Sequence, residues 1–149
     1  MRRNIRIRLA GVYVQNQKIL LVKHRKGSSE YYLLPGGGQE PGESAHEALE
    51  REWKEELNLE AEVGNFLFFG ESVPPNGLKK SQVLQLVFSI SNVKGSLFTE
   101  KSGALVGSEW IPLEELPNIK LFPRCFTQLN ASLIGKNPEW YQKYNWIHA

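Results

Sequence analysis

The chain is poor in cysteine: Cys125 is the only one among its 149 residues. One thiol cannot form a disulfide within the chain, which fits a reducing compartment. A lone cysteine is more often a small buried residue than a nucleophile, so we expect Cys125 in the core.

The chain also lacks long apolar runs. No segment approaches the roughly 18 apolar residues of a membrane span. Arginines at positions 2, 3, 6 and 8 interrupt the N-terminal segment before the apolar core of a signal peptide could form. We therefore predict a cytoplasmic protein with no membrane partner.

Neither sign of charge dominates, because the chain has 18 Lys and Arg residues and 16 Asp and Glu residues, a net charge of +2. This is too little to argue for nucleic-acid binding. The three histidines are not paired at metal-ligand spacing. The length and the apolar content of 41% suit a globular chain. We expect residues 1–149 to form one domain.

The most informative stretch is residues 36–59, where a glycine-rich loop precedes an acidic segment. Ser44 is a favoured N-cap residue, and Glu47, three positions later, completes a capping box. Asn58 tolerates the left-handed conformation in which many helices end. The sequence therefore predicts a helix over residues 45–57.

Three glutamates of this predicted helix, Glu52, Glu55 and Glu56, stand at i, i+3 and i+4 and so share one face. Like charges at that spacing destabilise an isolated helix, and a cation between them would remove the cost. Carboxylates suit Mg²⁺ or Mn²⁺. An adjacent apolar stripe centred on Trp53 should face the core, which leaves the acids at the edge of a cleft.

The stretch resembles the signature of the Nudix, or MutT-like, hydrolases. Seven specified positions match that signature in register over 23 residues: Gly37, Glu43, Arg51, Glu52, Glu55, Glu56 and Leu59. Two positions depart from it, because Trp53 replaces an aliphatic residue and Asn58 replaces a glycine. Neither departure removes a charged group, so the implied chemistry is retained.

The resemblance implies a metal-dependent enzyme that hydrolyses a nucleoside diphosphate linked to another group. Glu52 and Glu56, one turn apart, are the best pair of metal ligands, and the family implies the backbone carbonyl of Gly36 as a further one. Glu52 also belongs to the expected catalytic set with Glu55 and Arg51. Glu55 either binds metal or takes the proton from water. Arg51 is expected to orient a neighbouring glutamate.

Two other glutamates have weaker assignments. Glu43 belongs to the signature, and we expect it to be structural. Glu100 is a less favoured candidate for a distant base or ligand, because loop glutamates after the late strand have that role in relatives.

Three residues outside the signature are predicted to bind substrate. Arg25 lies in a basic run at the end of a predicted buried strand, where a solvated strand end is the plainer alternative. Tyr32 could stack on a base, although a buried aromatic is more common. Lys79 lies in the irregular segment 72–81, which could form a lid or an exposed loop tip.

Strand-like patterns lie on both sides of the predicted helix, at residues 5–15, 18–23, 31–34, 60–71, 82–92 and 108–111. The first two look like a hairpin, and residues 123–134 are expected to form a closing helix. These elements favour an α/β (α+β) fold. The resemblance implies the Nudix α/β/α sandwich, with a twisted mixed sheet between helices.

Residues 137–149 form an aromatic tail with Trp140, Tyr141, Tyr144 and Trp146. This composition is unlike that of a disordered segment. We expect the tail to pack on the domain or on a second subunit and to shield both tryptophans from solvent.

Three functions are considered. The first is cleavage of a small nucleotide such as ADP-ribose, a nucleotide sugar or a nucleoside triphosphate. The second is removal of pyrophosphate from RNA 5′ ends, for which Arg2, Arg3, Arg6 and Arg8 are a hint. The third is a nucleotide-sensing module without catalysis, which would be expected to lose the metal-binding acids that this chain keeps. We favour the first, in a monomer or homodimer with a small nucleotide as partner.

Overall fold

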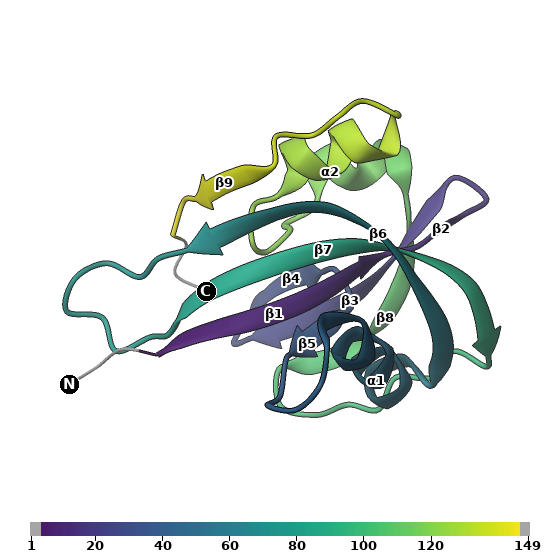
Figure 1. Ribbon diagram of the computed structural model, residues 1–149, viewed down its shortest axis with the longest axis horizontal. Helices are drawn as coiled ribbons and strands as arrows, with labels where there is room; N and C mark the ends of the chain where they lie inside the picture. Colours follow the sequence, from purple (N-terminus) through teal and green to yellow (C-terminus); the bar gives the residue numbers. More distant parts are fainter. Residues whose placement is uncertain (1–3, 147–149) are drawn as a thin grey trace.

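The computed structural model describes residues 4–146, which form two sheets and the helices that cover them (Figure 1). In spatial order the first sheet contains β5 (Gly36–Gly38), β1 (Ile5–Val12), β7 (Gln82–Gly95), β6 (Leu59–Ser72) and β9 (Tyr141–Tyr144). In the second sheet the central strand is β3 (Lys18–Lys26), which pairs with β2 (Val14–Gln15), β4 (Ser29–Leu33) and β8 (Leu105–Pro112). Strand β1 runs parallel to β7, and β6 runs parallel to β9, whereas the other pairs are antiparallel.

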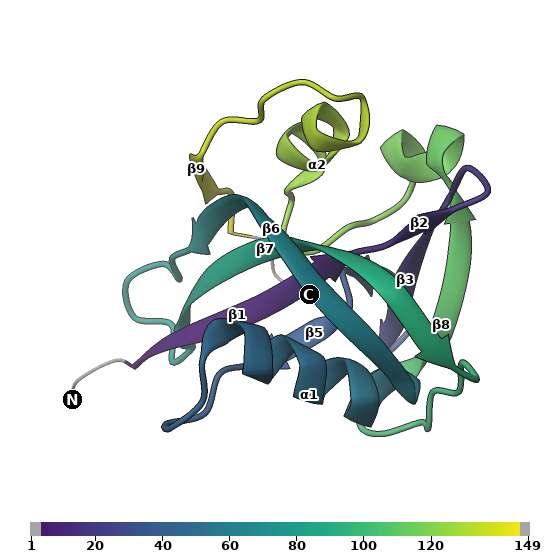
Figure 2. The ribbon, with the colours of Figure 1, turned by 45° about the vertical axis from the view of Figure 1, so that its right-hand side comes forward.

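Helix α1 (Ala45–Leu57) and helix α2 (Phe126–Leu133) lie on opposite sides of the sheets, as Figures 1 and 2 show. A short 3₁₀ helix, η1 (Leu113–Asn118), follows β8. Each side has its own hydrophobic core, one around Trp53 of α1 and one around Leu129 of α2. Strand β3 contributes alternate residues to both cores, as its continuous apolar run predicts. The predicted α/β/α sandwich with a mixed sheet is confirmed.

Helix α1 has the predicted bounds because its end signals are local. The Ser44 hydroxyl accepts a hydrogen bond from the Glu47 backbone N–H at 3.1 Å. At the other end Asn58 adopts φ 59°, the left-handed conformation of a helix C-cap. The fully buried Trp53 faces the core between the helix and the sheets.

Other bounds differ from the sequence prediction. The strand expected at residues 5–15 is interrupted at Tyr13, so that β2 forms the hairpin with β3 while β1 joins the other sheet. The hairpin turns at Asn16 and Gln17, both with positive φ, which matches the twist of paired strands. Part of the glycine loop is itself a strand, β5. Helix α2 begins later than expected, at Phe126, directly after the buried Cys125.

The aromatic tail packs on the domain through residue 146. Its strand β9 pairs with the outer edge of β6, and the buried Tyr144 hydroxyl donates a hydrogen bond to Gln128 of α2. The prediction that Trp140 is shielded is wrong, because its side chain is 73% exposed. It precedes β9 and lies beside Phe66 on the surface, with ring centroids 6.1 Å apart. Among residues 4–146 no helix is long and apolar enough to cross a membrane.

Candidate active site

The glycine strand β5 lies tightly between β1 and helix α1. Gly37 pairs with Leu9 of β1, and a Cβ atom added to Gly37 would lie 2.3 Å from the carboxylate carbon of Glu52. A Cβ atom on Gly36 would lie 1.9 Å from the Leu9 carbonyl oxygen. These approaches exclude any side chain, so glycine at both positions lets Glu52 pack directly on the β5 backbone.

Helix α1 is tied to the residues just before and within β5. The Gly36 N–H donates to Glu56 Oε1 at 3.2 Å. One turn earlier on the helix, the buried Trp53 indole N–H donates to the Pro35 carbonyl at 3.1 Å. The same carbonyl accepts from the Gly11 N–H at 2.9 Å. The position of the glycine strand is therefore fixed from the helix and from β1 together.

Arg51 joins three carboxylates and the glycine strand. Its guanidinium donates twice to Glu43, at 2.7 and 3.0 Å, and once to the Gly38 carbonyl, at 3.0 Å. Its Nη1 donates to Glu52 Oε1 at 3.0 Å and to Glu55 Oε2 at 3.2 Å. Arg51 thus contacts the neighbouring Glu52 while Glu43 and Gly38 hold the rest of its guanidinium group.

Glu43 lies at the centre of the turn before helix α1. The Arg51 guanidinium, followed by the Glu40 backbone N–H, lowers the pKa of Glu43 to about 2. Its two oxygens accept from Arg51 and from the Glu40 N–H. The carboxylate is thus used within the protein, as expected for a structural residue.

The three glutamates predicted on one face have different surroundings. The Glu55 side chain is 61% exposed and extends toward Arg51, whereas Glu56 is half-buried against Gly36. Within residues 4–146 no three acidic, His or Cys side chains converge as one metal site. Of the three, Glu52 and Glu56 are the ones that contact strand β5, at Gly37 and Gly36 respectively.

The donors at this strand fit a hard divalent cation. Both are carboxylates, the ligand type that Mg²⁺ and Mn²⁺ prefer. Burial raises the pKa of Glu56 to about 7, although the positive charge of Arg8 acts in the opposite direction. A cation beside Glu56 would favour its charged form and offset this desolvation. The contact between Gly36 and Glu56 runs through the Gly36 backbone N–H.

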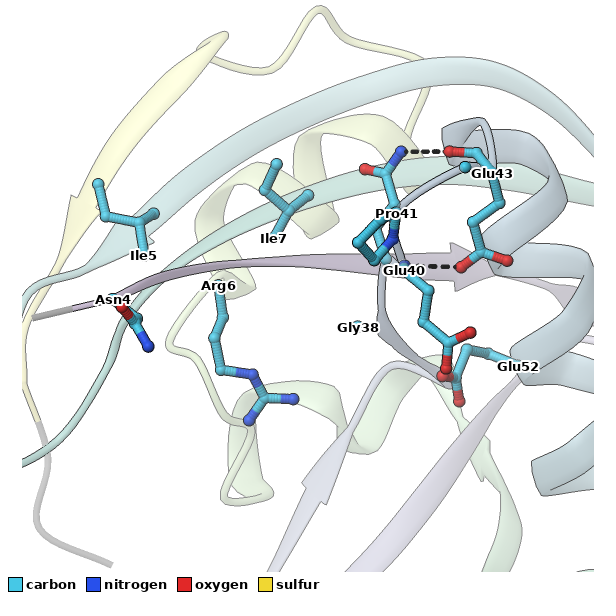
Figure 3. A pocket seen from close by; sticks show the side chains of 11 residues that line it. Asn4, Ile5, Arg6, Ile7, Gly38, Glu40, Pro41, Glu43 and Glu52 are labelled. Atoms are coloured by element: carbon cyan, nitrogen blue, oxygen red, sulfur yellow. Dashed lines mark hydrogen bonds between the residues drawn. The ribbon is translucent and has the colours of Figure 1, made fainter.

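A surface cavity of about 770 Å³ opens beside these groups (Figure 3). Residues 4–7 at the start of β1, the segment 38–43 and Glu52 line it. A smaller cavity of about 130 Å³ adjoins Gly38 and is lined by Arg6, Arg8 and Val83 among others. The cavity thus has Glu52 of α1 and the acidic segment before that helix on one wall, and β1 on the other.

Arg8 is a half-buried cation that contacts the same segment from the β1 side. Its guanidinium donates to the Leu34 carbonyl at 2.7 Å and to Gln85 Oε1 at 2.8 Å. Burial lowers the pKa of Arg8, and the nearby Glu56 opposes that shift. Arg6 and Arg8 were not predicted as residues of this site, although their spacing of two indicates a shared strand face.

The three predicted substrate-binding residues do not line the cavity. Arg25 is exposed and forms an ion pair with Glu30 at 3.0 Å. The half-buried Tyr32 donates its hydroxyl hydrogen to Glu109 at 3.0 Å. Lys79 lies exposed in the loop between β6 and β7. Glu100, in the loop between β7 and β8, is also exposed and outside the cavity.

The family model described as "NUDIX domain" matches residues 5–129. The chain is 32% identical over 111 residues to an ADP-ribose pyrophosphatase of Methanocaldococcus jannaschii, covering 73% of this chain and 63% of that protein. It is 31% identical over 121 residues to human 8-oxo-dGDP phosphatase NUDT18, covering 78% of this chain and 35% of that protein. The chain therefore spans less than two thirds of the length of either relative.

The fold is also that of a solved structure, described as a MutT NUDIX hydrolase from Burkholderia pseudomallei. The two superpose with a TM-score of 0.72 at 23% identity, over 86% of this chain and 98% of the other. The signature in α1, the matched family model and the shared fold agree. The chain belongs to the Nudix hydrolase family.

Proposed function

We propose that this chain is a metal-dependent hydrolase that cleaves the pyrophosphate bond of a small nucleoside diphosphate derivative. The observation that carries the proposal is the packing of Glu52 and Glu56 on the glycine strand, beside a cavity of about 770 Å³. In this proposal residues 1–149 form one Nudix domain, which acts in the cytoplasm as a monomer or homodimer.

Glu52, Glu56 and the Gly36 carbonyl would hold Mg²⁺ or Mn²⁺. When bound, such a cation neutralises the charge of a diphosphate and acidifies a water molecule. Arg51 acts as a positioning residue, because it donates to Glu52 while its other nitrogens bind Glu43 and Gly38. Glu55, which is exposed and accepts from the same Arg51 nitrogen as Glu52, is the candidate base.

The substrate class is supported by the names of the relatives. The archaeal relative is named for ADP-ribose and the human one for 8-oxo-dGDP, and both compounds contain a nucleoside diphosphate. We propose an ADP-ribose-type substrate, with nucleotide sugars or nucleoside triphosphates as alternatives. Arg25, Tyr32 and Lys79 lie outside the cavity and are assigned no contact with the diphosphate.

A panel of nucleotides with Mg²⁺ or Mn²⁺ tests the proposal. We expect ADP-ribose to yield AMP and ribose 5-phosphate, and turnover to cease in excess chelator. The Glu52→Gln variant, assayed in parallel, reports contaminating activity. Absence of cleavage across the panel, or full turnover with chelator, contradicts the proposal.

A further inference from the structure

Arg6 is a cation of the cavity whose charge is not used within the described part of the chain. It lies on the same face of β1 as Arg8, since the two are separated by one residue. Arg8 is engaged by Leu34 and Gln85. In contrast, Arg6 is exposed and forms no hydrogen bond or ion pair with any residue from 4 to 146.

The glycine strand leaves room for this side chain. A Cβ atom placed on Gly38 would lie 3.4 Å from Arg6 Nη2, so the guanidinium group lies directly over the Gly38 backbone. Figure 3 shows the Arg6 side chain extending from β1 toward Gly38, with Glu52 on the far side of that glycine. Arg6 therefore lies on the cavity wall that faces the proposed metal-binding side.

Among residues 4–146, no carboxylate forms an ion pair with Arg6. Three carboxylates line the cavity with it: Glu43 and Glu52 are bound to Arg51, and Glu40 is exposed. The nearest cation on the same strand face is Arg8, and two like charges so placed attract an anion. A guanidinium group recognises phosphate through paired, charge-assisted hydrogen bonds.

We propose that Arg6 binds one phosphate group of the substrate's diphosphate, on the side of the cavity opposite Glu52. This assignment rests on the proposed function for the identity of the natural ligand, but the site itself is defined by Arg6, Gly38 and the cavity. A diphosphate can place one phosphate at Arg6 and the other at the cation held by Glu52, whereas a monophosphate has only one phosphate to offer. Monophosphate products therefore bind more weakly than the substrate.

Calorimetric titration with imidodiphosphate, a non-hydrolysable diphosphate, tests the site in the presence of Mg²⁺. The Arg6→Gln variant should weaken binding about tenfold, since losing one charge-assisted hydrogen bond costs at least about 1.4 kcal/mol. Arg6→Lys keeps the charge and should retain part of the affinity. Arg25→Gln removes an exposed arginine outside the cavity and should bind like the parent. Orthophosphate should bind more weakly than imidodiphosphate to the parent.

Three outcomes overturn the inference: a parent that does not bind imidodiphosphate, an Arg6→Gln variant that binds like the parent, or equal weakening in Arg6→Gln and Arg25→Gln. The last would indicate general charge attraction. The proposed function fails separately. If the parent binds imidodiphosphate through Arg6 but cleaves no nucleotide, the inference stands and the hydrolase proposal falls. If Arg6→Gln cleaves nucleotides with the same KM as the parent, the hydrolase proposal stands and the inference about Arg6 falls.

Discussion

The glycine strand is supported from its two sides by arginines in opposite surroundings. On the helix side Arg51 is bound to Glu43, Glu52 and Glu55, in a network that solvent reaches. On the β1 side the half-buried Arg8 donates to two neutral oxygens. In the proposed function, the helix side arranges charge for metal ligands, whereas the β1 side fixes the backbone on which those ligands depend.

The largest expected effect lies on the helix side. Glu52→Gln and Glu56→Gln preserve size and nearly preserve helix propensity. Each should lower turnover at least ~10²-fold, because loss of a charge-stabilising contact in the transition state commonly costs about 2.7 kcal/mol or more. Steady-state kinetics with Mg²⁺ measure this. Glu47→Gln, on the same helix but at the cap, is the matched control and should keep most activity. Parent-like turnover in either variant would contradict the assignment.

The next effect lies on the β1 side and concerns stability. Arg8→Met leaves the Leu34 carbonyl and the Gln85 side chain, which is 1% exposed, without their donor. A buried polar group that loses its partner costs about 1–3 kcal/mol, so we expect a loss of about 2 kcal/mol in urea unfolding.

Arg51→Met serves as the comparison for Arg8→Met. Its carboxylate partners remain accessible to water, so unfolding free energy should fall by only about 1 kcal/mol while turnover falls about tenfold. The contrast between the two sides fails if Arg51→Met destabilises the protein more than Arg8→Met does.

A smaller effect on stability and metal affinity is expected at Trp53, which replaces an aliphatic residue of the Nudix signature. Trp53→Phe retains an aromatic ring but loses the indole N–H that donates to Pro35. One hydrogen bond contributes about 1 kcal/mol, so unfolding free energy should fall by that amount plus a packing term. Mg²⁺ affinity should also weaken, because Gly36 follows Pro35. Tyr13→Phe is the control, because it removes a hydroxyl group and keeps the aromatic ring that contacts Trp53. Unchanged stability and metal affinity in Trp53→Phe would show that this bond does not position the strand.

The smallest effect is the pH dependence of the metal-free protein. Because the folded state raises the pKa of Glu56 to about 7, the neutral form stabilises the fold, and this contribution is lost as pH rises from about 4.5 to 7. At pH 8 the unfolding free energy of Glu56→Gln should therefore exceed that of the parent, by about 1 kcal/mol or less after solvent screening. At pH 4 the two proteins should be similarly stable. Thermal unfolding with chelator measures it. A parent that is more stable than the variant at pH 8 contradicts the sign.

The helix could be predicted from sequence because its signals are local. Ser44, Glu47 and Asn58 define its ends within a few residues, and the spacing of the glutamates follows from helix periodicity. The parallel pairing of β9 with β6 could not be predicted, since it joins segments about seventy residues apart with no turn between them.

The site was only partly predictable for a similar reason. Strand alternation places Arg6 and Arg8 on one face, but only the register with Gly38 and Gln85 shows which groups that face meets. The distinct surroundings of Glu55 and Glu56 depend on Arg51, one turn earlier on the same helix, and on the Gly36 N–H of β5. Likewise, Trp53 gave no signal in the sequence that its N–H would reach Pro35.

The most direct test of the central claim is the binding of Mn²⁺ itself, followed by electron paramagnetic resonance. The account predicts that the parent and Glu47→Gln bind Mn²⁺ with similar affinity, and that Glu52→Gln and Glu56→Gln each bind it at least about tenfold more weakly. If all four proteins bind Mn²⁺ equally, or if none binds it, the two glutamates on the glycine strand are not the metal site.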